Sequence, residues 1–275
     1  MKKLFTSLLM VTVLLCSCSS KTVLNEDVPK YREPVNVLKE ELPKDFSPKD
    51  FHIVSIGDSL TFGVGDSTNS GGYLPYLEAR LENEKGVRDA RLLNLGVRGH
   101  RTSQLLNKLQ AEDVQKAITA ADIVILTTGG NDIMKVVKEN FSDLRLNDFV
   151  HERVLYEEQL AGIIGAIKKA NPAAVVYLVG LYNPFFQYFA DIRELDLIME
   201  DWNETSKKVL AKYPEAYFVD VAEVFRNSDR NLLHSDYFHP NDDGYKLMAE
   251  QIYLQIQERL FKKTSSQKIT TKRSN

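Results

Sequence analysis

The sequence has very little cysteine. Only Cys16 and Cys18 occur among 275 residues, and both lie close to the N-terminus. Because no cysteine follows residue 18, the rest of the chain can form neither a disulfide nor a thiolate metal site. A domain without these cross-links depends on a large apolar core for its stability, and a chain of this length is long enough to bury one.

Basic residues are also too few for a protein that binds nucleic acid. The chain carries 35 Lys and Arg against 38 Asp and Glu. Two of the basic residues are Lys2 and Lys3, and five more lie in 262–275, a stretch without acidic residues. The other 28 basic residues are outnumbered by the 38 acidic ones. The rest of the chain therefore has no excess of positive charge that could displace phosphate counterions. We therefore expect no nucleic-acid partner.

Long apolar runs are scarce, and the one at the N-terminus is short. Leu4–Leu15 is mostly apolar, follows two lysines, and is too short for a permanent transmembrane helix. This arrangement predicts a secretory signal over residues 1–18. Its end resembles a bacterial lipobox, which implies cleavage after Ser17, a lipid on Cys18 and an anchored lipoprotein at the outer face of the cell membrane. The alternatives are an uncleaved N-terminal anchor and an ordinary secreted protein.

Composition divides the rest of the chain into three parts. Residues 19–48 are polar and contain four prolines, which predicts a flexible tether. Residues 49–261 are predicted to form one domain, since they contain no internal repeat and no low-complexity stretch. Residues 262–275 are predicted to form a disordered basic tail; the alternative is weak adhesion to anionic lipid or wall polymer.

Apolar runs and helical patterns alternate within 49–261. The runs are rich in β-branched residues and nearly continuous, as in strands that are buried on both faces. This alternation predicts a three-layer α/β/α domain with a parallel sheet of five strands, whose ligands bind beyond the carboxyl ends of the strands. The expected strands are 52–56, 91–95, 123–126, 174–179 and 216–220, and the expected helices lie near 74–81, 155–167, 195–209 and 245–256.

Ser59 follows the first expected strand, within Gly57–Leu60. A helix that begins here would place the hydroxyl among outward-pointing N–H groups, which suits an anionic tetrahedral intermediate. Thr61 stands where a Gly-x-Ser-x-Gly elbow has its second glycine, which argues against an ordinary α/β-hydrolase. Considered alone, Ser59 is better explained as a helix cap.

Asp236 and His239 lie three residues apart, just before Pro240 and the start of the last expected helix. This spacing lets the carboxylate orient the imidazole as a general base toward a serine hydroxyl. The alternative is that both residues only organise the turn. No second histidine lies within two to four residues of His239, so we expect no metal site.

Asn131 and Gly96 end two further expected strands. Two glycines precede Asn131, so its amide can project from the backbone and donate to a developing oxyanion. The N–H of Gly96 could be another donor. Considered alone, each residue is explained as part of a turn.

Taken together, these motifs resemble the SGNH hydrolase superfamily, the GDSL-type lipases and esterases. The four motifs occur in the order of the superfamily's four blocks and span nearly the whole domain: Gly57–Leu60, Gly96 within 94–99, Gly129–Asp132, and Asp236 with His239. The resemblance implies a flavodoxin-like order of strands and hydrolysis without a cofactor. The chain also resembles lipoproteins of Gram-positive bacteria that are similar to lysophospholipase-type esterases.

The same resemblance implies a role for each matched residue. Ser59 is the implied nucleophile, His239 the base, and Asp236 the carboxylate that orients it. The implied oxyanion hole consists of the N–H groups of Ser59 and Gly96 and the side chain of Asn131.

Two segments are expected to set the specificity. One is Lys135–Val150, and the other is 182–189, where five of eight residues are aromatic. Phe185, Phe186 and Tyr188 are expected to line the site; the alternative is that they cover the sheet end as core. An apolar wall favours an acyl chain over an acetyl group.

The predicted function is therefore hydrolysis of acyl or lysophospholipid esters through an acyl-serine intermediate. The alternatives are an O-acetylesterase for wall polysaccharide, a non-catalytic lipoprotein that binds a ligand, and acyl transfer to an alcohol other than water. We expect a monomer.

Overall fold

The computed structural model describes residues 47–186 and 192–260. The predicted signal with Cys18, most of the tether, Tyr188 and the basic tail lie outside these residues, so the expectations about them stay predictions. No helix within the described parts of the chain is long and apolar enough to cross a membrane.

Five strands form one parallel sheet in the order β2-β1-β3-β4-β5. This is the flavodoxin-like order, so the predicted α/β fold with its parallel sheet is confirmed. The strands are β1 (Lys49–Gly57), β2 (Val87–Gly96), β3 (Ile123–Thr127), β4 (Val175–Val179) and β5 (Ala216–Val219).

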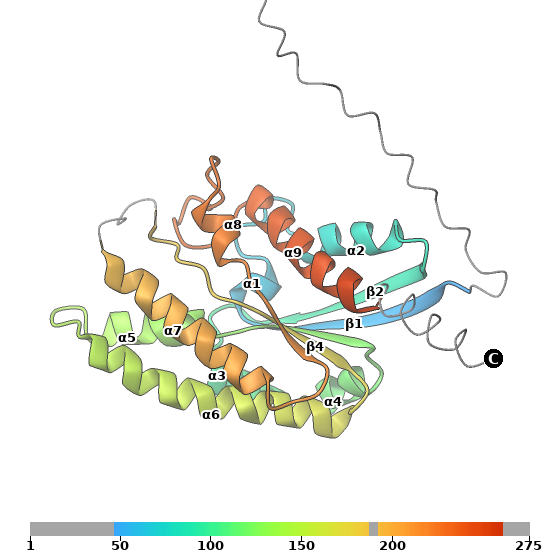
Figure 1. Ribbon diagram of the computed structural model, residues 1–275, viewed down its shortest axis with the longest axis horizontal. Coiled ribbons are helices and arrows are strands. Elements are labelled where there is room, and N and C mark those ends of the chain that lie inside the picture. Colours follow the sequence, from blue (N-terminus) through green and yellow to red (C-terminus); the bar gives the residue numbers. More distant parts are fainter. Residues whose placement is uncertain (1–46, 187–191, 261–275) are drawn as a thin grey trace, which may run out of the picture. The chain divides into compact units, whose positions relative to one another are not determined.

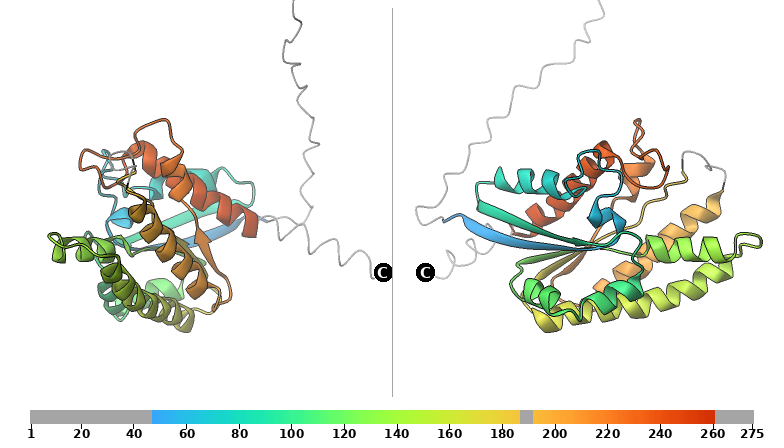
Figure 2. Two further views of the ribbon diagram at one scale, coloured as in Figure 1. Left: turned by 60° about the vertical axis from the view of Figure 1, so that its left-hand side comes forward. Right: turned by 180° about the vertical axis from the view of Figure 1, so that it is seen from behind.

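Helices cover both faces of the sheet (Figure 1). One face carries α1 (Ser59–Phe62), α2 (Leu74–Glu82), α8 (Ala222–Arg226) and α9 (Asp242–Leu260). The other face carries α3 (Thr102–Lys108), α4 (Glu112–Thr119), α5 (Gly130–Glu139), α6 (Leu146–Ala170) and α7 (Arg193–Leu210). The same two layers are seen from the side and from behind in Figure 2.

The strands supply both halves of the core. Successive strand side chains point to opposite faces, so Ile53 packs with α2 and α9, whereas Val54 packs with the layer of α6 and α7. Both side chains are buried, because helices exclude water from each face. This double coverage is the reason that the strands are continuously apolar in sequence.

The carboxyl ends of the strands meet at one edge of the sheet. Gly57 at the end of β1 is in register with Gly96 of β2 and Thr127 of β3, and Thr127 is in register with Val179 of β4. Because the strand order reverses between β1 and β3, the loops that follow these two strands diverge and leave a crevice. The segments after β1 and β3 contain Ser59 and Asn131.

Candidate active site

Ser59 is the first residue of α1, which follows β1 after a single intervening residue. That residue, Asp58, caps the helix: its Oδ1 atom accepts a hydrogen bond of 3.0 Å from the N–H of Leu60. The short helix ends at Gly63, which adopts a left-handed conformation. The Asp58 cap and the turn at Gly63 together fix the position and direction of the Ser59 side chain.

A chain of buried hydroxyl groups lies beneath the serine. The Oγ1 atom of Thr127 donates to Asp58 Oδ1 at 2.8 Å and lies 2.8 Å from Thr61 Oγ1. The hydroxyl of Tyr73 lies 3.1 Å from Thr61 Oγ1 and 2.5 Å from Ser55 Oγ. Burial raises the pKa of Asp58, although the hydrogen bonds that it accepts work in the opposite direction. Through Ser55, Thr127 and Tyr73, the network connects the turn that carries Ser59 to β1, to β3 and to the start of α2.

His239 lies between Ser59 and Asp236. Its Nε2 atom is 2.9 Å from Ser59 Oγ, and its Nδ1 atom is 2.6 Å from Asp236 Oδ2. Desolvation opposes ionisation of Asp236, but hydrogen bonds from the His239 ring and from two backbone N–H groups lower its pKa. The ionised carboxylate only accepts, so Nδ1 carries the proton and Nε2 is left to accept from the serine hydroxyl. The structure therefore brings together the three residues that the sequence motifs single out.

The segment that carries His239 is fixed from both sides. Tyr182, which follows β4, donates its hydroxyl to the carbonyl of Phe238 at 2.7 Å. The N–H of His234 donates to the carbonyl of His239 at 2.7 Å. Asn241 caps α9, since its Oδ1 atom accepts from the N–H of Gly244 at 3.0 Å.

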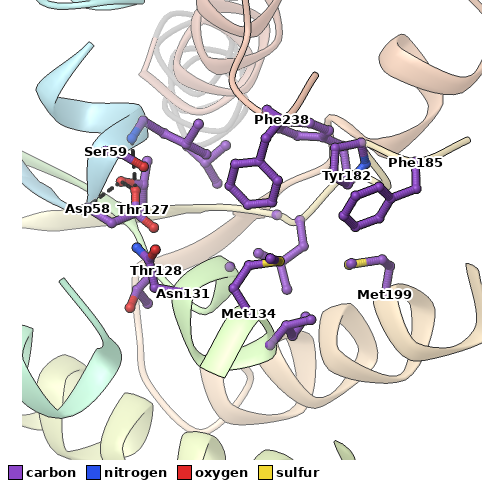
Figure 3. A pocket seen from close by; sticks show the side chains of 17 residues that line it. Asp58, Ser59, Thr127, Thr128, Asn131, Met134, Tyr182, Phe185, Met199 and Phe238 are labelled. Atoms are coloured by element: carbon purple, nitrogen blue, oxygen red, sulfur yellow. Dashed lines mark hydrogen bonds between the residues drawn. The ribbon is translucent and has the colours of Figure 1, made fainter. Parts of the chain in front are cut away.

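Asn131 is the second residue of α5, and it lines one pocket together with Ser59. Both side chains lie at the same end of this pocket (Figure 3). The Nδ2 atom of Asn131 donates to the carbonyl of His100 at 2.9 Å. An amide nitrogen carries two hydrogens, so this bond orients the side chain and leaves the second hydrogen for a ligand.

Gly96 is not a free donor, which corrects the expectation from the sequence. Its N–H donates to Asn94 Oδ1 at 2.9 Å, and a Cβ atom at this position would lie 2.2 Å from the backbone nitrogen of Phe62. Gly96 thus allows β2 and α1 to approach closely, and its N–H is already used.

Gly99, three residues later, is the better donor in this loop. Its φ angle is +77°, and its N–H forms no hydrogen bond within the described residues. It precedes His100, whose carbonyl accepts from Asn131. The sequence shows a glycine at both positions, so only the backbone geometry separates their roles.

Asp132 supports the start of α5 from below. Its side chain is 2 % exposed, and its Oδ2 atom accepts from the N–H of Thr102 at 3.1 Å and from the Thr102 hydroxyl at 2.7 Å. Burial raises the pKa of Asp132 to about 6, against the hydrogen bonds from Thr102, which lower it. These bonds join the first residue of α3 to α5 next to Asn131.

An apolar pocket extends from Ser59 across the ends of β3 and β4 (Figure 3). The empty space between its walls, part of which is open to solvent, amounts to about 570 Å³. Its walls away from the serine consist mainly of apolar and aromatic side chains, among them Ile133, Met134, Leu181, Tyr182, Phe185 and Met199.

The predicted specificity segments contribute unequally to this pocket. Phe185 lines it, whereas Phe186 lines two neighbouring cavities and Tyr188 lies outside the described residues. In Lys135–Val150, which is expected to help set the specificity, Phe141 is 85 % exposed and Phe149 is buried in the core, and neither lines the pocket. No group of three or more metal-ligating side chains occurs among the residues that the structure describes.

Sequence reasoning missed the two methionines of the pocket. Met134 lies on α5 and Met199 on α7. Methionines on amphipathic helices look the same in a sequence whether they fill a core or line a cavity. No signal in this chain distinguishes the two cases.

Comparisons with known proteins give a consistent picture. Residues 55–247 match the model of the GDSL-like Lipase/Acylhydrolase family. The chain is 32 % identical over 258 residues to the uncharacterized protein YpmR of Bacillus subtilis, covering 93 % of this chain and 96 % of that protein. It is 26 % identical over 202 residues to the spore germination lipase LipC of Bacillus licheniformis, covering 72 % and 92 %.

Solved structures share the fold. The lipase Lip_vut3 from a goat rumen metagenome superposes with a TM-score of 0.67 at 24 % identity, covering 74 % of this chain and 95 % of the other. A catalytic mutant of Axe2, an acetylxylan esterase from Geobacillus stearothermophilus, superposes with a TM-score of 0.58 at 19 % identity, covering 77 % and 96 %.

Proposed function

The chain belongs to the GDSL-like lipase/acylhydrolase family of SGNH hydrolases and is a carboxylic ester hydrolase, and we propose that it cleaves acyl esters, lysophospholipids among them, through an acyl-serine intermediate. One observation carries this proposal: Ser59, which is hydrogen-bonded to His239, lines one end of an apolar pocket. A hydroxyl nucleophile, its base and an apolar acyl site are the parts that the reaction needs.

The geometry supports a specific order of events. Ser59 Oγ attacks the ester carbonyl and forms the new C–O bond while its proton moves to His239 Nε2. Asp236 stabilises the imidazolium through the hydrogen bond from Nδ1. His239 then gives the proton to the departing alcohol, which leaves an acyl group on Ser59. A water molecule, deprotonated by the same imidazole, then attacks the acyl carbon; the bond from this carbon to Ser59 Oγ breaks, His239 returns the proton to Oγ, and the carboxylic acid is released.

The negative oxygen of each tetrahedral intermediate needs donors. The second amide hydrogen of Asn131 and the N–H groups of Ser59 and Gly99 are the groups that this structure offers. Ser59 lies at the N-terminus of α1, where backbone N–H groups lack partners within the helix. We assign Gly99 in place of Gly96, because the Gly96 N–H is bonded to Asn94.

The pocket favours an acyl chain as the acid part of the ester. An acetyl group would occupy only the space next to Ser59 and leave the apolar walls formed by Met134, Leu181 and Phe185 without contact. Each buried methylene contributes about 0.8 kcal/mol of hydrophobic stabilisation. LipC and Lip_vut3, to which the chain is similar, are both lipases, and this supports the choice.

An O-acetylesterase for polysaccharide is the second candidate. The observation in its favour is the likeness of fold to the acetylxylan esterase Axe2. The two candidates differ in the acid part of their substrates, so chain-length dependence separates them.

We also propose that the enzyme acts at the outer face of the cell membrane. Support comes from the sequence alone, namely the apolar Leu4–Leu15 and the lipobox-like end at Cys18. Incorporation of labelled fatty acid into the protein in living cells tests this proposal, with Cys18→Ser as the control. Labelling that persists in Cys18→Ser would contradict it.

The proposed function is tested with the purified full-length protein. Turnover of p-nitrophenyl esters from acetate to palmitate, and of lysophosphatidylcholine, is compared with that of Ser59→Ala. We expect kcat/KM to rise with chain length beyond acetate and to vanish in Ser59→Ala. A strict preference for acetate, with acetate released from acetylated polysaccharide, would favour the second candidate. Folded protein without activity on any ester would refute both.

A further inference from the structure

A second cavity lies beyond the acyl pocket. The empty space between its walls, part of which is open to solvent, amounts to about 300 Å³, and the walls include Phe186, Asp196 and Arg226. Met199 is the one described residue that lines both this cavity and the acyl pocket. Its side chain therefore forms the partition between two adjoining spaces, and it lies opposite Phe185 at the far end of the pocket from Ser59 (Figure 3).

The frame around this partition is held by hydrogen bonds. Asn203, one turn further along α7, pairs with both the N–H and the carbonyl of Leu181 at 2.8 Å each. Asn183 donates to Asp196 Oδ1 at 2.9 Å, and Arg226 forms an ion pair with the same carboxylate at 3.4 Å. These contacts fix α7 against the segment after β4.

Met199 itself is held only by packing. Its side chain is 8 % exposed and contacts the cavity walls through apolar atoms. Methionine is unbranched, has three rotatable side-chain bonds and adapts to irregular spaces. The Met199 side chain can therefore change its rotamer, or be replaced by a side chain of another size, while the hydrogen bonds between α7 and the segment after β4 stay in place.

We propose that Met199 sets the length of the acyl chain that the enzyme accepts. This inference rests on the proposed function, since it takes the pocket beside Ser59 as the acyl site. In the observed position, Met199 ends the apolar pocket, and the chain's last carbons meet its thioether. The space behind it is lined by the ion-paired Asp196 and Arg226, so an apolar chain end that pushed past Met199 would meet charged groups.

This arrangement predicts the shape of the chain-length profile. Each methylene buried before the partition raises kcat/KM about fourfold, which corresponds to about 0.8 kcal/mol. The rise ends at the carbon that reaches Met199. Acetate esters do not extend to the partition, so their turnover is independent of this residue.

The test compares p-nitrophenyl ester profiles from acetate to palmitate for the wild type and two variants. Met199→Ala joins the cavities, so the break in the profile should move by roughly three carbons to longer chains, the number of heavy atoms removed. Met199→Phe should move it to shorter chains. Leu197→Ala, an exposed neighbour on α7 outside both cavities, is the matched control and should retain the wild-type profile.

Separate readouts distinguish the possible failures. An unchanged break in Met199→Ala, with acetate turnover and melting temperature retained, would overturn the inference while leaving the proposed function intact. If Met199→Ala does not fold, Met199→Phe decides by the direction of its shift. If the folded wild-type protein hydrolyses none of the esters, the proposed function itself is refuted. Fatty-acid displacement of a fluorescent probe from Ser59→Ala, which needs no turnover, should show the same chain-length break.

Discussion

Ser59 Oγ lies 2.9 Å from His239 Nε2, although the two residues are 180 positions apart in the chain. The sheet creates this proximity, because β1 delivers the serine and the segment that enters α9 delivers the histidine to the same edge. The buried hydroxyl network on one side and the Tyr182 hydroxyl on the other hold the two loops in place. The pair is thus built into the fold before any substrate arrives.

Asp236 is predicted to act on the reaction through His239. In Asp236→Asn the amide can no longer hold Nδ1 protonated, so Nε2 presents a proton to Ser59 instead of accepting one. We expect kcat to fall by about 10⁴-fold, as it does in serine protease triads with this change. Steady-state kinetics on the preferred p-nitrophenyl ester measures it.

Asp243→Asn is the matched control for this change. Asp243 pairs with Arg230 on the surface and makes no contact with the triad, so its variant should retain activity within twofold. An Asp236→Asn enzyme that keeps a tenth or more of the wild-type kcat would contradict the assigned role.

Asn131 is predicted to donate to the oxyanion. Removing its amide in Asn131→Ala should lower kcat by about 10²–10³-fold with little effect on KM, because the interaction forms only in the transition state. Asn140→Ala, at the other end of α5, removes an amide that bonds only to the carbonyl of Val136 and serves as control. Equal kcat values for the two variants would exclude Asn131 from the oxyanion hole.

The strands and the catalytic motifs could be predicted because each leaves a strong local signal. All five strands occur where the sequence places them, since burial on both faces makes them continuously apolar. The short helices α3, α4 and α8 were not expected, because five to eight residues contain too few turns for a periodic pattern. Ser59 follows a recognisable strand end and His239 precedes a recognisable helix start, so their proximity was predictable.

Details that depend on side-chain conformation could not be predicted. Gly96 and Gly99 are equivalent in sequence, and the N–H of Gly96 is used only because Asn94 folds back onto it. Phe185 and Phe186 are neighbours, yet they line different cavities because the segment after β4 is irregular. Met199 is a partition only because a cavity lies on each side of it, and no pattern in the sequence marks either cavity.

Asp132 is predicted to make stability fall as the pH rises. Its pKa is raised by burial to about 6 in the folded protein, so the folded state binds the proton more tightly than the unfolded chain does. The contribution of Asp132 to the free energy of unfolding is therefore largest below about pH 4, and it declines as the pH rises to about 6. A shift of about two units corresponds to about 3 kcal/mol between the two limits.

Urea denaturation between pH 3.5 and 7.5 measures this effect. In Asp132→Asn the group no longer titrates, so the unfolding free energy of the wild type, taken relative to this variant, should decrease over the window. Other buried carboxyls such as Asp58 titrate in both proteins and cancel in the difference. Asp143→Asn, an exposed change of the same type, is the control for the loss of one carboxylate charge. Parallel profiles for wild type and Asp132→Asn would disprove the assignment.

Asn203 is predicted to be the main polar anchor of the pocket wall. Its side chain is 6 % exposed and satisfies the N–H and the carbonyl of Leu181 together. Asn203→Leu has a similar size but leaves both backbone groups buried without a partner, and each such group costs about 1–3 kcal/mol. Chemical denaturation should therefore show a loss of about 2–6 kcal/mol for the two groups together.

Asn203→Leu can also be tested by enzyme kinetics, because Leu181 lies in the wall of the acyl pocket. Because Leu181 lines the acyl pocket, loosening it should raise KM for long-chain esters more than for acetate. Asn203→Asp keeps the acceptor for the Leu181 N–H but replaces the donor with a buried negative charge that faces the Leu181 carbonyl, so at neutral pH it should destabilise the protein at least as much as Asn203→Leu. If Asn203→Leu unfolds at the same denaturant concentration as Asn227→Leu, a change at an exposed amide of α8's C-terminus, then the paired bonds do not hold this wall.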